Sequence, residues 1–203
     1  MITMTPVVER PVGDCPFWSV EPGEYHVEVP RSPTPSRVAV LAWALVAHGV
    51  DDVDLHADVS DAVGAVDAFL AAEDERHVPG GLRIVAGDVV ADPGCCFGLD
   101  EWRTWLEVLD GEAIWLGHSP DTVVQHRGEV VRIWPNEDLA NPRFTGPHVD
   151  IARDALLGHL REVREDLVGF LDALGTWARS TVPDRADRFV AAVDRRLGIS
   201  PPL

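Results

Sequence analysis

The stretch that constrains the fold most strongly is residues 91–134, ADPGCCFGLDEWRTWLEVLDGEAIWLGHSPDTVVQHRGEVVRIW. It holds four of the seven tryptophans and two of the three cysteines of the chain. A helix is predicted over residues 101–109, with Asp100 as its N-cap. Four large apolar residues recur at i, i+3, i+4 and i+7 and share the inward face of that helix: Trp102, Trp105, Leu106 and Leu109. We therefore expect this stretch to form the structural centre of the fold.

Short strands are predicted further along the same stretch. Residues 113–117 (AIWLG) form one expected strand. The segments TVVQH and EVVRIW flank Arg127–Gly128, a pair that suits a two-residue hairpin turn. In that register Val124 would lie opposite Val131. Trp134, at the end of the hairpin, is the tryptophan we expect to be exposed.

An apolar helix is predicted upstream. Thr34 is a good N-cap, and Pro35 suits the first helical position. The helix should end at His48, because Gly49 follows it. Its residues VAVLAWALVA are apolar on nearly every face, which indicates burial against a sheet.

A strand and a second helix are expected next. Residues 52–59 (DVDLHADV) alternate between apolar and polar side chains, which is typical of a half-buried strand. Ser60 would then cap a helix over residues 61–76. Residues 82–91 read as a strand with a bulge or tight turn at Gly87–Asp88.

The C-terminal segment differs in character from the rest. From Asp150 to Ser180 we expect one long helix, followed by a last helix from Pro183 to Gly198. The long helix carries a heptad seam: Leu156, Leu160, Val163, Leu167, Phe170, Leu174 and Trp177. The two helices are predicted to form an antiparallel hairpin packed on the sheet domain. Alternatively, the 156–177 seam could dimerise, and the sequence leaves the oligomeric state open.

Together these patterns predict an α+β fold. It would contain one mixed sheet of about five to seven short strands, two packed helices and the C-terminal helical hairpin. Residues 1–22 are expected to form an irregular N-terminal arm, because they are rich in proline. Residues 23–149 would form the α+β domain, and residues 150–203 the hairpin packed on it.

The charge of the chain restricts its partners. The formal net charge is −17, and all 17 basic residues are arginine. No basic residue lies between Arg37 and Arg76, whereas residues 51–75 contain nine acids. The negative electrostatic field of these acids disfavours binding to nucleic acid and anionic membranes and favours a basic protein partner. A simpler reading is that the acids only keep the protein in solution.

The first functional hypothesis is a non-enzymatic, cytoplasmic protein-binding module with no cofactor and no metal. An immunity protein or another inhibitor is one form of it, with electrostatic complementarity speeding association. The expected partner-binding residues are Asp52, Asp54, Asp58, Asp61, Asp67 and, as an aromatic anchor, Trp134. The cytoplasm is expected because an odd cysteine count argues against a disulfide scaffold, and no secretory signal or membrane span is evident.

The second hypothesis is a small thiol- or metal-dependent enzyme. Cys95 or Cys96 would act with His118 or His126, although nothing in the sequence sets the distance between them. Adjacent cysteines lack the CxxC spacing of zinc and redox motifs, so buried structural thiols are the simpler expectation. Phosphate loops, nucleophile elbows and HExxH motifs are all absent.

One resemblance accompanies these patterns. The block CCFGLDEWRTWL, followed by WLGH, VVRIW and the long helix, resembles a group of actinobacterial proteins that have no assigned activity. The similarity covers roughly residues 82–197 and implies no function. In type alone, as a small acidic α+β protein without a catalytic motif, the chain is similar to bacterial toxin-immunity proteins.

Overall fold

Alternating apolar residues build the central layer of the protein. In the computed structural model, which describes residues 1–50, 54–72, 77–135 and 144–203, strand β1 (Ile2–Glu9) pairs with strand β3 (Gly80–Ala86). Met4 and Ile84 lie opposite each other and are both buried, whereas Thr5 and Arg83 on the other face are half-exposed. One face of this pair therefore carries the core.

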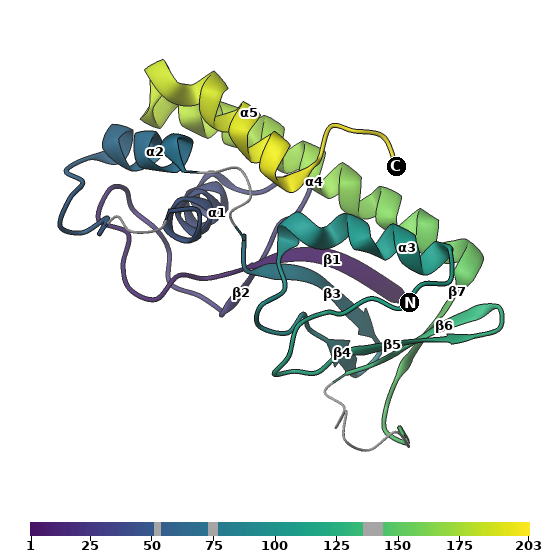
Figure 1. The fold of residues 1–203 in the computed structure, drawn as a ribbon. Coiled ribbons are helices and arrows are strands. Elements are labelled where there is room, and N and C mark those ends of the chain that lie inside the picture. Colours follow the sequence, from purple (N-terminus) through teal and green to yellow (C-terminus); the bar gives the residue numbers. More distant parts are fainter. Residues whose placement is uncertain (51–53, 73–76, 136–143) are drawn as a thin grey trace.

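Two short edge strands complete the first sheet. Its order is β2-β1-β3-β4, with β2 at His26–Glu28 and β4 at Val89–Ala91, and every pairing is antiparallel. Figure 1 shows the helices gathered on one side of this sheet. The predicted tight turn at Gly87–Asp88 is confirmed: it joins β3 to β4, and Gly87 has a φ of +60°.

The predicted irregular arm is wrong for residues 2–9. These residues form β1, which lies between β2 and β3 in the middle of the sheet. Proline is unfavourable in a central strand because it lacks an N–H donor. Pro6 is accommodated in β1 because its carbonyl still accepts a hydrogen bond from the Val29 backbone N at 2.8 Å. The segment does not fray because pairing on both sides outweighs the missing donor.

A second, three-stranded sheet lies beside the first. It consists of β5 (Val123–Arg127), β6 (Val130–Trp134) and β7 (Val149–Ala152), again all antiparallel. Within the described ranges the α+β class is confirmed, but the single mixed sheet is wrong. The seven described strands divide between two sheets, and every pairing among them is antiparallel.

The hairpin between β5 and β6 has a different register from the predicted one. Arg127 pairs with Val130, so Gly128 and Glu129 form the loop, and Val124 lies opposite Ile133. Gly128 adopts a φ of +65°, which suits a glycine better than an arginine at the first loop position. The turn therefore begins one residue later than predicted.

The apolar helix is confirmed with both of its ends. Helix α1 runs over Pro35–His48, and the Thr34 hydroxyl accepts a hydrogen bond from the Arg37 backbone N at 3.3 Å. Gly49 forms the C-cap. Nine consecutive side chains from Val38 to Val46 are buried, as the all-round apolar pattern predicts.

Helix α2 is shorter than expected and has a different cap. It spans Ala62–Ala71, and the Asp61 carboxylate, rather than the predicted Ser60, accepts a hydrogen bond from Gly64 N at 2.8 Å. The predicted end at residue 76 falls among residues 73–76, outside the described residues.

The tryptophan-rich helix forms the predicted buried centre. It begins as the 3-10 helix η1 (Leu99–Thr104) and continues as α3 (Trp105–Leu109). Trp102 and Trp105 are fully buried, and Trp102 Nε1 donates to the Leu197 carbonyl at 2.8 Å. The predicted Asp100 cap is wrong, because its carboxylate accepts from the Val78 backbone N instead. Residues 113–117 do not form the expected strand; Trp115 makes only an isolated bridge with Val123.

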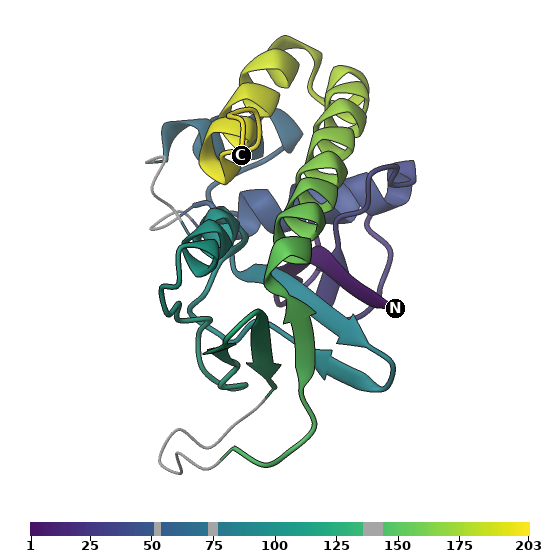
Figure 2. The same ribbon diagram turned by 90° about the vertical axis from the view of Figure 1, so that its right-hand side faces the viewer.

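The C-terminal helical pair is confirmed, with a strand before it. Residues 149–152 are β7, and the long helix α4 covers Arg153–Thr181. After the 3-10 turn η2 (Pro183–Arg185), α5 (Ala186–Leu197) runs back along α4 and ends at Gly198, which has a φ of +58°. Figure 2 shows β7 leading directly into α4, so the predicted boundary at residue 150 falls inside a strand.

The heptad seam is buried inside the chain. Six of its seven residues are at most 1% exposed: Leu156, Leu160, Val163, Leu167, Phe170 and Leu174. They belong to one continuous core with the strands and with α1. The seam is therefore covered within a single chain, and dimerisation through it stays an untested alternative. Among the described helices, none has both the length and the apolar composition that a membrane span requires.

The α4 seam can be tested by comparing two neighbouring residues. Leu167 is fully buried, whereas Val168 is 38% exposed. We expect Leu167→Ala to lower the free energy of unfolding by about 2–5 kcal/mol, because it leaves a cavity in the core. Val168→Ala should change it by less than about 1 kcal/mol. Urea denaturation measures both, and equal effects of the two substitutions would contradict the packing.

Candidate functional site

The acidic segment forms a turn rather than the predicted strand. Asp54 Oδ1 accepts hydrogen bonds from the backbone N of His56 at 2.9 Å and of Ala57 at 3.1 Å. Asp58 Oδ2 accepts from the Asp54 backbone N at 3.2 Å. Aspartate side chains often bind nearby backbone donors in this way, which competes with strand pairing. Asp52, another predicted partner-binding residue, lies outside the described residues.

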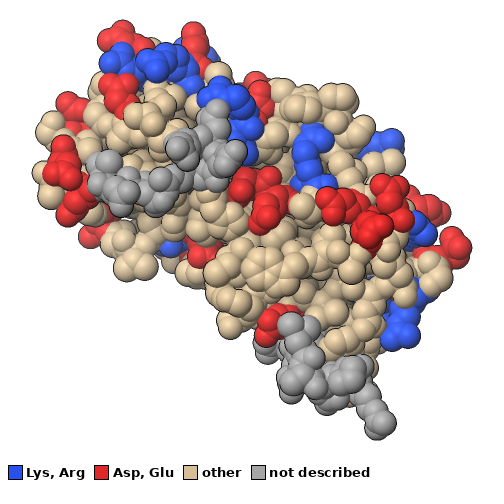
Figure 3. All heavy atoms as spheres, in the orientation of Figure 1, with Lys and Arg blue, Asp and Glu red and all other residues tan. Residues whose placement is uncertain are grey.

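The two remaining acids of the predicted surface have internal partners. Asp61 caps α2, and Asp67 forms two hydrogen bonds with Arg185, at 2.6 Å to Nε and 3.0 Å to Nη2. These bonds from Arg185 hold the pKa of Asp67 below its usual value. Figure 3 shows arginines interspersed with acids over the end of the helical pair. Of the predicted partner-binding acids that the structure describes, Asp54, Asp58 and Asp61 are exposed. Asp67 is half-exposed and paired with Arg185.

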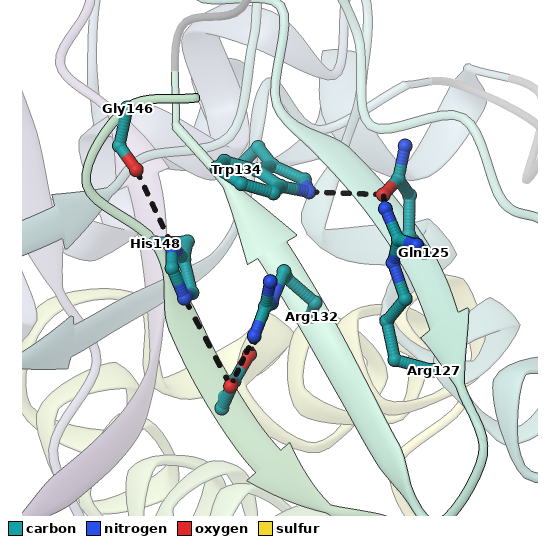
Figure 4. A network of polar contacts seen from close by, with 7 residues as sticks. Gln125, Arg127, Arg132, Trp134, Gly146 and His148 are labelled. Atoms are coloured by element: carbon teal, nitrogen blue, oxygen red, sulfur yellow. Dashed lines mark hydrogen bonds and ion pairs between the residues drawn. The ribbon is translucent and has the colours of Figure 1, made fainter. Parts of the chain in front are cut away.

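The predicted exposure of Trp134 is wrong. Its side chain is 3% exposed, and its Nε1 donates to Gln125 Oε1 at 3.1 Å (Figure 4). His148 lies against its ring with centroids 4.6 Å apart, and the Arg132 guanidinium lies 5.4 Å from the ring centroid. Gln125 lies on β5 and Arg132 on β6 itself, whereas His148 lies just before β7, more than ten residues along the chain from Trp134. The exposed tryptophan is Trp115, at 55%.

Two loops bring a pair of cysteines and a histidine together. The backbone N of Cys95 donates to the His118 carbonyl at 2.7 Å, and His118 N donates to the Cys95 carbonyl at 3.1 Å. This isolated bridge places the two side chains next to each other.

The close approach of these loops depends on two glycines. A Cβ at Gly94 would lie 2.5 Å from His118 N, and a Cβ at Gly117 would lie 2.5 Å from the Cys95 carbonyl oxygen. Gly117 also has a φ of +86°. No residue with a side chain would allow the backbones to come so close. The glycines in DPGCC and WLGH thus have a direct role in forming the site.

The three side chains form a compact cluster at the surface. Cys95 Sγ lies 2.6 Å from His118 Nδ1, and His118 Nε2 lies 4.0 Å from Cys95 Sγ and 3.9 Å from Cys96 Sγ. One ligand atom from each residue can be chosen such that all three lie within 4.8 Å of one another. Cys95 is half-buried, while Cys96 and His118 are exposed. The expectation of buried structural thiols is therefore wrong.

Backbone strain occurs at the same place. Among the described residues other than glycine, only Cys96 and Ser119 have positive φ angles, +65° and +53°. Cys96 belongs to the cluster, and Ser119 directly follows His118. Residues in this left-handed region cost free energy and concentrate at functional sites.

The resting thiol is not activated as a nucleophile. Burial raises the pKa of the Cys95 thiol above its ordinary value, and the Cys96 thiol and the Glu9 carboxylate raise it further. The same region holds Tyr25, where burial together with a hydrogen bond to Glu9 raises the pKa to about 12. A reactive cysteine has a lowered pKa instead. The raised pKa of Cys95 therefore gives no support for a catalytic nucleophile.

The other candidates from the sequence lie apart from this cluster. His126 Nε2 is hydrogen-bonded to the Glu112 carbonyl at 2.9 Å. Cys15 packs beside Phe17 and Trp18 at the edge of the core. The exposed Trp115 does adjoin the cluster, with its ring 6.2 Å from that of His118 and nearly perpendicular to it. The exposure of Trp115 is not evident from the sequence, because the pattern of residues 113–117 predicts a strand.

Comparisons with known proteins return no match: no family model, no curated protein and no solved structure is similar to this chain. The resemblance to actinobacterial proteins stays a prediction. The site is accordingly described from its geometry alone.

The pair between Asp67 and Arg185 makes a prediction about pH. We expect Asp67→Asn to lower the free energy of unfolding at pH 7 by at most about 1 kcal/mol, because both side chains are partly exposed. The folded pKa is lowered from 3.8, so the stabilisation is present above that value and is lost as the pH falls through the folded pKa. Urea denaturation of the variant and the wild type between pH 7 and pH 3 measures this.

The control for that experiment is Glu129→Gln, in the exposed loop between β5 and β6. It should leave the free energy of unfolding nearly unchanged over the same pH range. A difference between Asp67→Asn and wild type that persists undiminished at pH 3 would argue against the ion pair.

Proposed function

We propose that this chain is a metal-binding protein in which Cys95, Cys96 and His118 hold one transition-metal ion. The observation that carries the proposal is that two thiols and an imidazole, from loops more than twenty residues apart, converge within 4.8 Å. Thiolate and imidazole ligands together suit zinc and, among softer ions, monovalent copper. Zinc is the ion we favour, because two cysteines and one histidine form a known type of zinc ligand set.

Coordination by His118 would use Nδ1, the ring nitrogen that faces Cys95. Cys95 Sγ lies 2.6 Å from Nδ1 and 4.0 Å from Nε2, so this sulfur is on the Nδ1 side of the ring. Zinc binds sulfur at about 2.3 Å and nitrogen at about 2.0–2.1 Å, so a tetrahedral site has a sulfur–nitrogen edge of about 3.6 Å. Cys95 Sγ and Nδ1 would therefore move apart by about 1 Å on binding. Cys96 Sγ, 3.9 Å from Nε2, would turn toward the same ion.

Three protein ligands would leave one position free. Within the described ranges, the cluster contains no fourth cysteine, histidine, aspartate or glutamate. Structural zinc sites normally have four protein ligands, whereas catalytic sites have three and an open position for water or substrate. The exposed location of Cys96 and His118 gives such a position access to solvent. This arrangement supports the metal-dependent form of the enzyme hypothesis.

The protein-binding hypothesis is kept as a second proposal. Asp54, Asp58 and Asp61 are exposed on one short segment of an acidic chain, and they would face a basic partner such as a toxin or another inhibited protein. Association through them should weaken steeply as salt is added. Without Trp134 as an anchor, the surface offers charge but little apolar area for tight binding.

Metal binding can be tested directly on the reduced, metal-free protein. We expect one equivalent of Zn²⁺ to bind in competition with a chromophoric chelator, and Co²⁺ to give a thiolate-to-metal charge-transfer band. Cys96→Ser and His118→Ala should each weaken Zn²⁺ binding by more than about 100-fold, because even residues that only support the ligands contribute 10–100-fold.

Matched controls are present in the chain. Cys15→Ser and His126→Ala remove the same residue types away from the cluster and should leave the affinity for Zn²⁺ and the Co²⁺ spectrum unchanged. The proposal fails if Co²⁺ gives no charge-transfer band, or if Cys15→Ser weakens Zn²⁺ binding as much as Cys96→Ser.

A further inference from the structure

We propose that a second, polar cleft binds a small zwitterion of the α-amino-acid class. The cleft has a volume of about 450 Å³, within the range of small-molecule sites, which is roughly 300–1,000 Å³. It is lined by residues that follow β1, by the loop before β2, by β2 itself and by the start of α1. None of the three residues of the metal cluster lines it, so the inference is independent of the proposed metal site.

The loop that forms one wall is held in place by an arginine. Arg10 Nε donates to the Glu24 carbonyl at 3.2 Å, and Arg10 Nη1 donates to the Glu21 carbonyl at 2.9 Å. A Cβ at Gly23 would lie 3.0 Å from Arg10 Nη2, so the glycine lets the loop approach the guanidinium. Because Arg10 binds the backbone carbonyls, it leaves the carboxylates of Glu21 and Glu24 free to bind a cationic group.

A second wall presents a positive charge. Arg37 lies in the first turn of α1 and lines the cleft. In the part of the chain that the structure describes, its guanidinium forms no ion pair with an acid. A guanidinium binds a carboxylate through two parallel hydrogen bonds, which makes Arg37 the natural contact for a ligand carboxylate.

The least exposed polar residue of the lining, His26, carries an unsatisfied polar atom. His26 lines the cleft with a side chain that is only 10% exposed. Its Nδ1 lies 3.6 Å from Asp92, while its buried Nε2 has no hydrogen-bond partner among the described residues. Burial lowers the pKa of His26, which favours the neutral ring, and Nε2 of a neutral ring can form one hydrogen bond. A buried polar atom without a partner is costly, and a bound ligand would satisfy Nε2 once the ring turns toward the cleft, because this atom is covered in the unliganded structure.

The combination of charges selects a zwitterion. A simple anion would be repelled by Glu21 and Glu24, and a simple cation would be repelled by Arg37. An α-amino acid carries an ammonium group and a carboxylate a few bonds apart, so it can contact both walls at once. Val40, the buried apolar residue of the lining, offers a surface for an uncharged ligand side chain.

The test uses the full chain and the common uncharged-side-chain amino acids, one at a time. Thermal shift identifies a ligand, and calorimetry measures its affinity. The same amino acid is then offered as its N-acetyl derivative, which lacks the ammonium group, and as its amide, which lacks the carboxylate. We expect the parent amino acid to bind and each derivative to bind at least about 10-fold more weakly, because each loses a charge-assisted contact.

Variants then assign the contacts. Arg37→Ala and Glu24→Gln should each weaken binding about 10-fold or more, while Arg161→Ala, an exposed arginine on α4, should have no effect. Cys96→Ser should bind the amino acid as the wild type does, which separates this site from the metal site. Several results would overturn the inference: no binding of any amino acid at millimolar concentration, equal binding of either derivative, or an equal loss in Arg161→Ala.

Discussion

The rest of the structure depends on the burial of one face of α4. This helix contacts β1, α1, α3, α5 and β7, so both sheets and three of the other helices meet along it. It also follows β7 without a loop, which ties the direction of the helix to the second sheet. Neither sheet is large enough to bury its own inner face, and α4 supplies the shared cover. The C-terminal pair is thus part of the main core and not an appendage.

The packing around α4 positions the candidate metal site indirectly, through the elements to which its two loops are attached. Trp102 is anchored to the end of α5 through its indole N–H, and the buried tryptophans hold the segment that follows Cys95 and Cys96. The loop with His118 leads into β5 of the second sheet. The two loops meet because each is attached to a rigid element, and Gly94 and Gly117 let their backbones touch. Local strain at Cys96 is tolerated because the surrounding packing determines the loop.

Much of the fold could be predicted from local patterns. Helix α1, the buried tryptophan helix and the C-terminal pair follow from periodicity and capping residues, because a helix is a local structure with local signals. The strands are harder to predict from the sequence than the helices. β1 is not predicted, because Pro6 argues against a central strand and because its partners in β3 lie more than seventy residues along the chain. The segment 54–58 was misread because aspartates at alternate positions also suit a turn in which their side chains bind the backbone.

The sequence by itself determined the α+β class, the apolar helices, the acidic charge and the candidate chemistry of Cys95, Cys96 and His118. Only the tertiary structure decided that these three side chains meet, that Trp134 is buried while Trp115 is exposed, and that Asp67 pairs with Arg185. The physical reason is the same in each case. Residue type and spacing determine what a side chain can do and which face of an element it occupies, but the distance between loops is set by the packing of elements far apart in the chain.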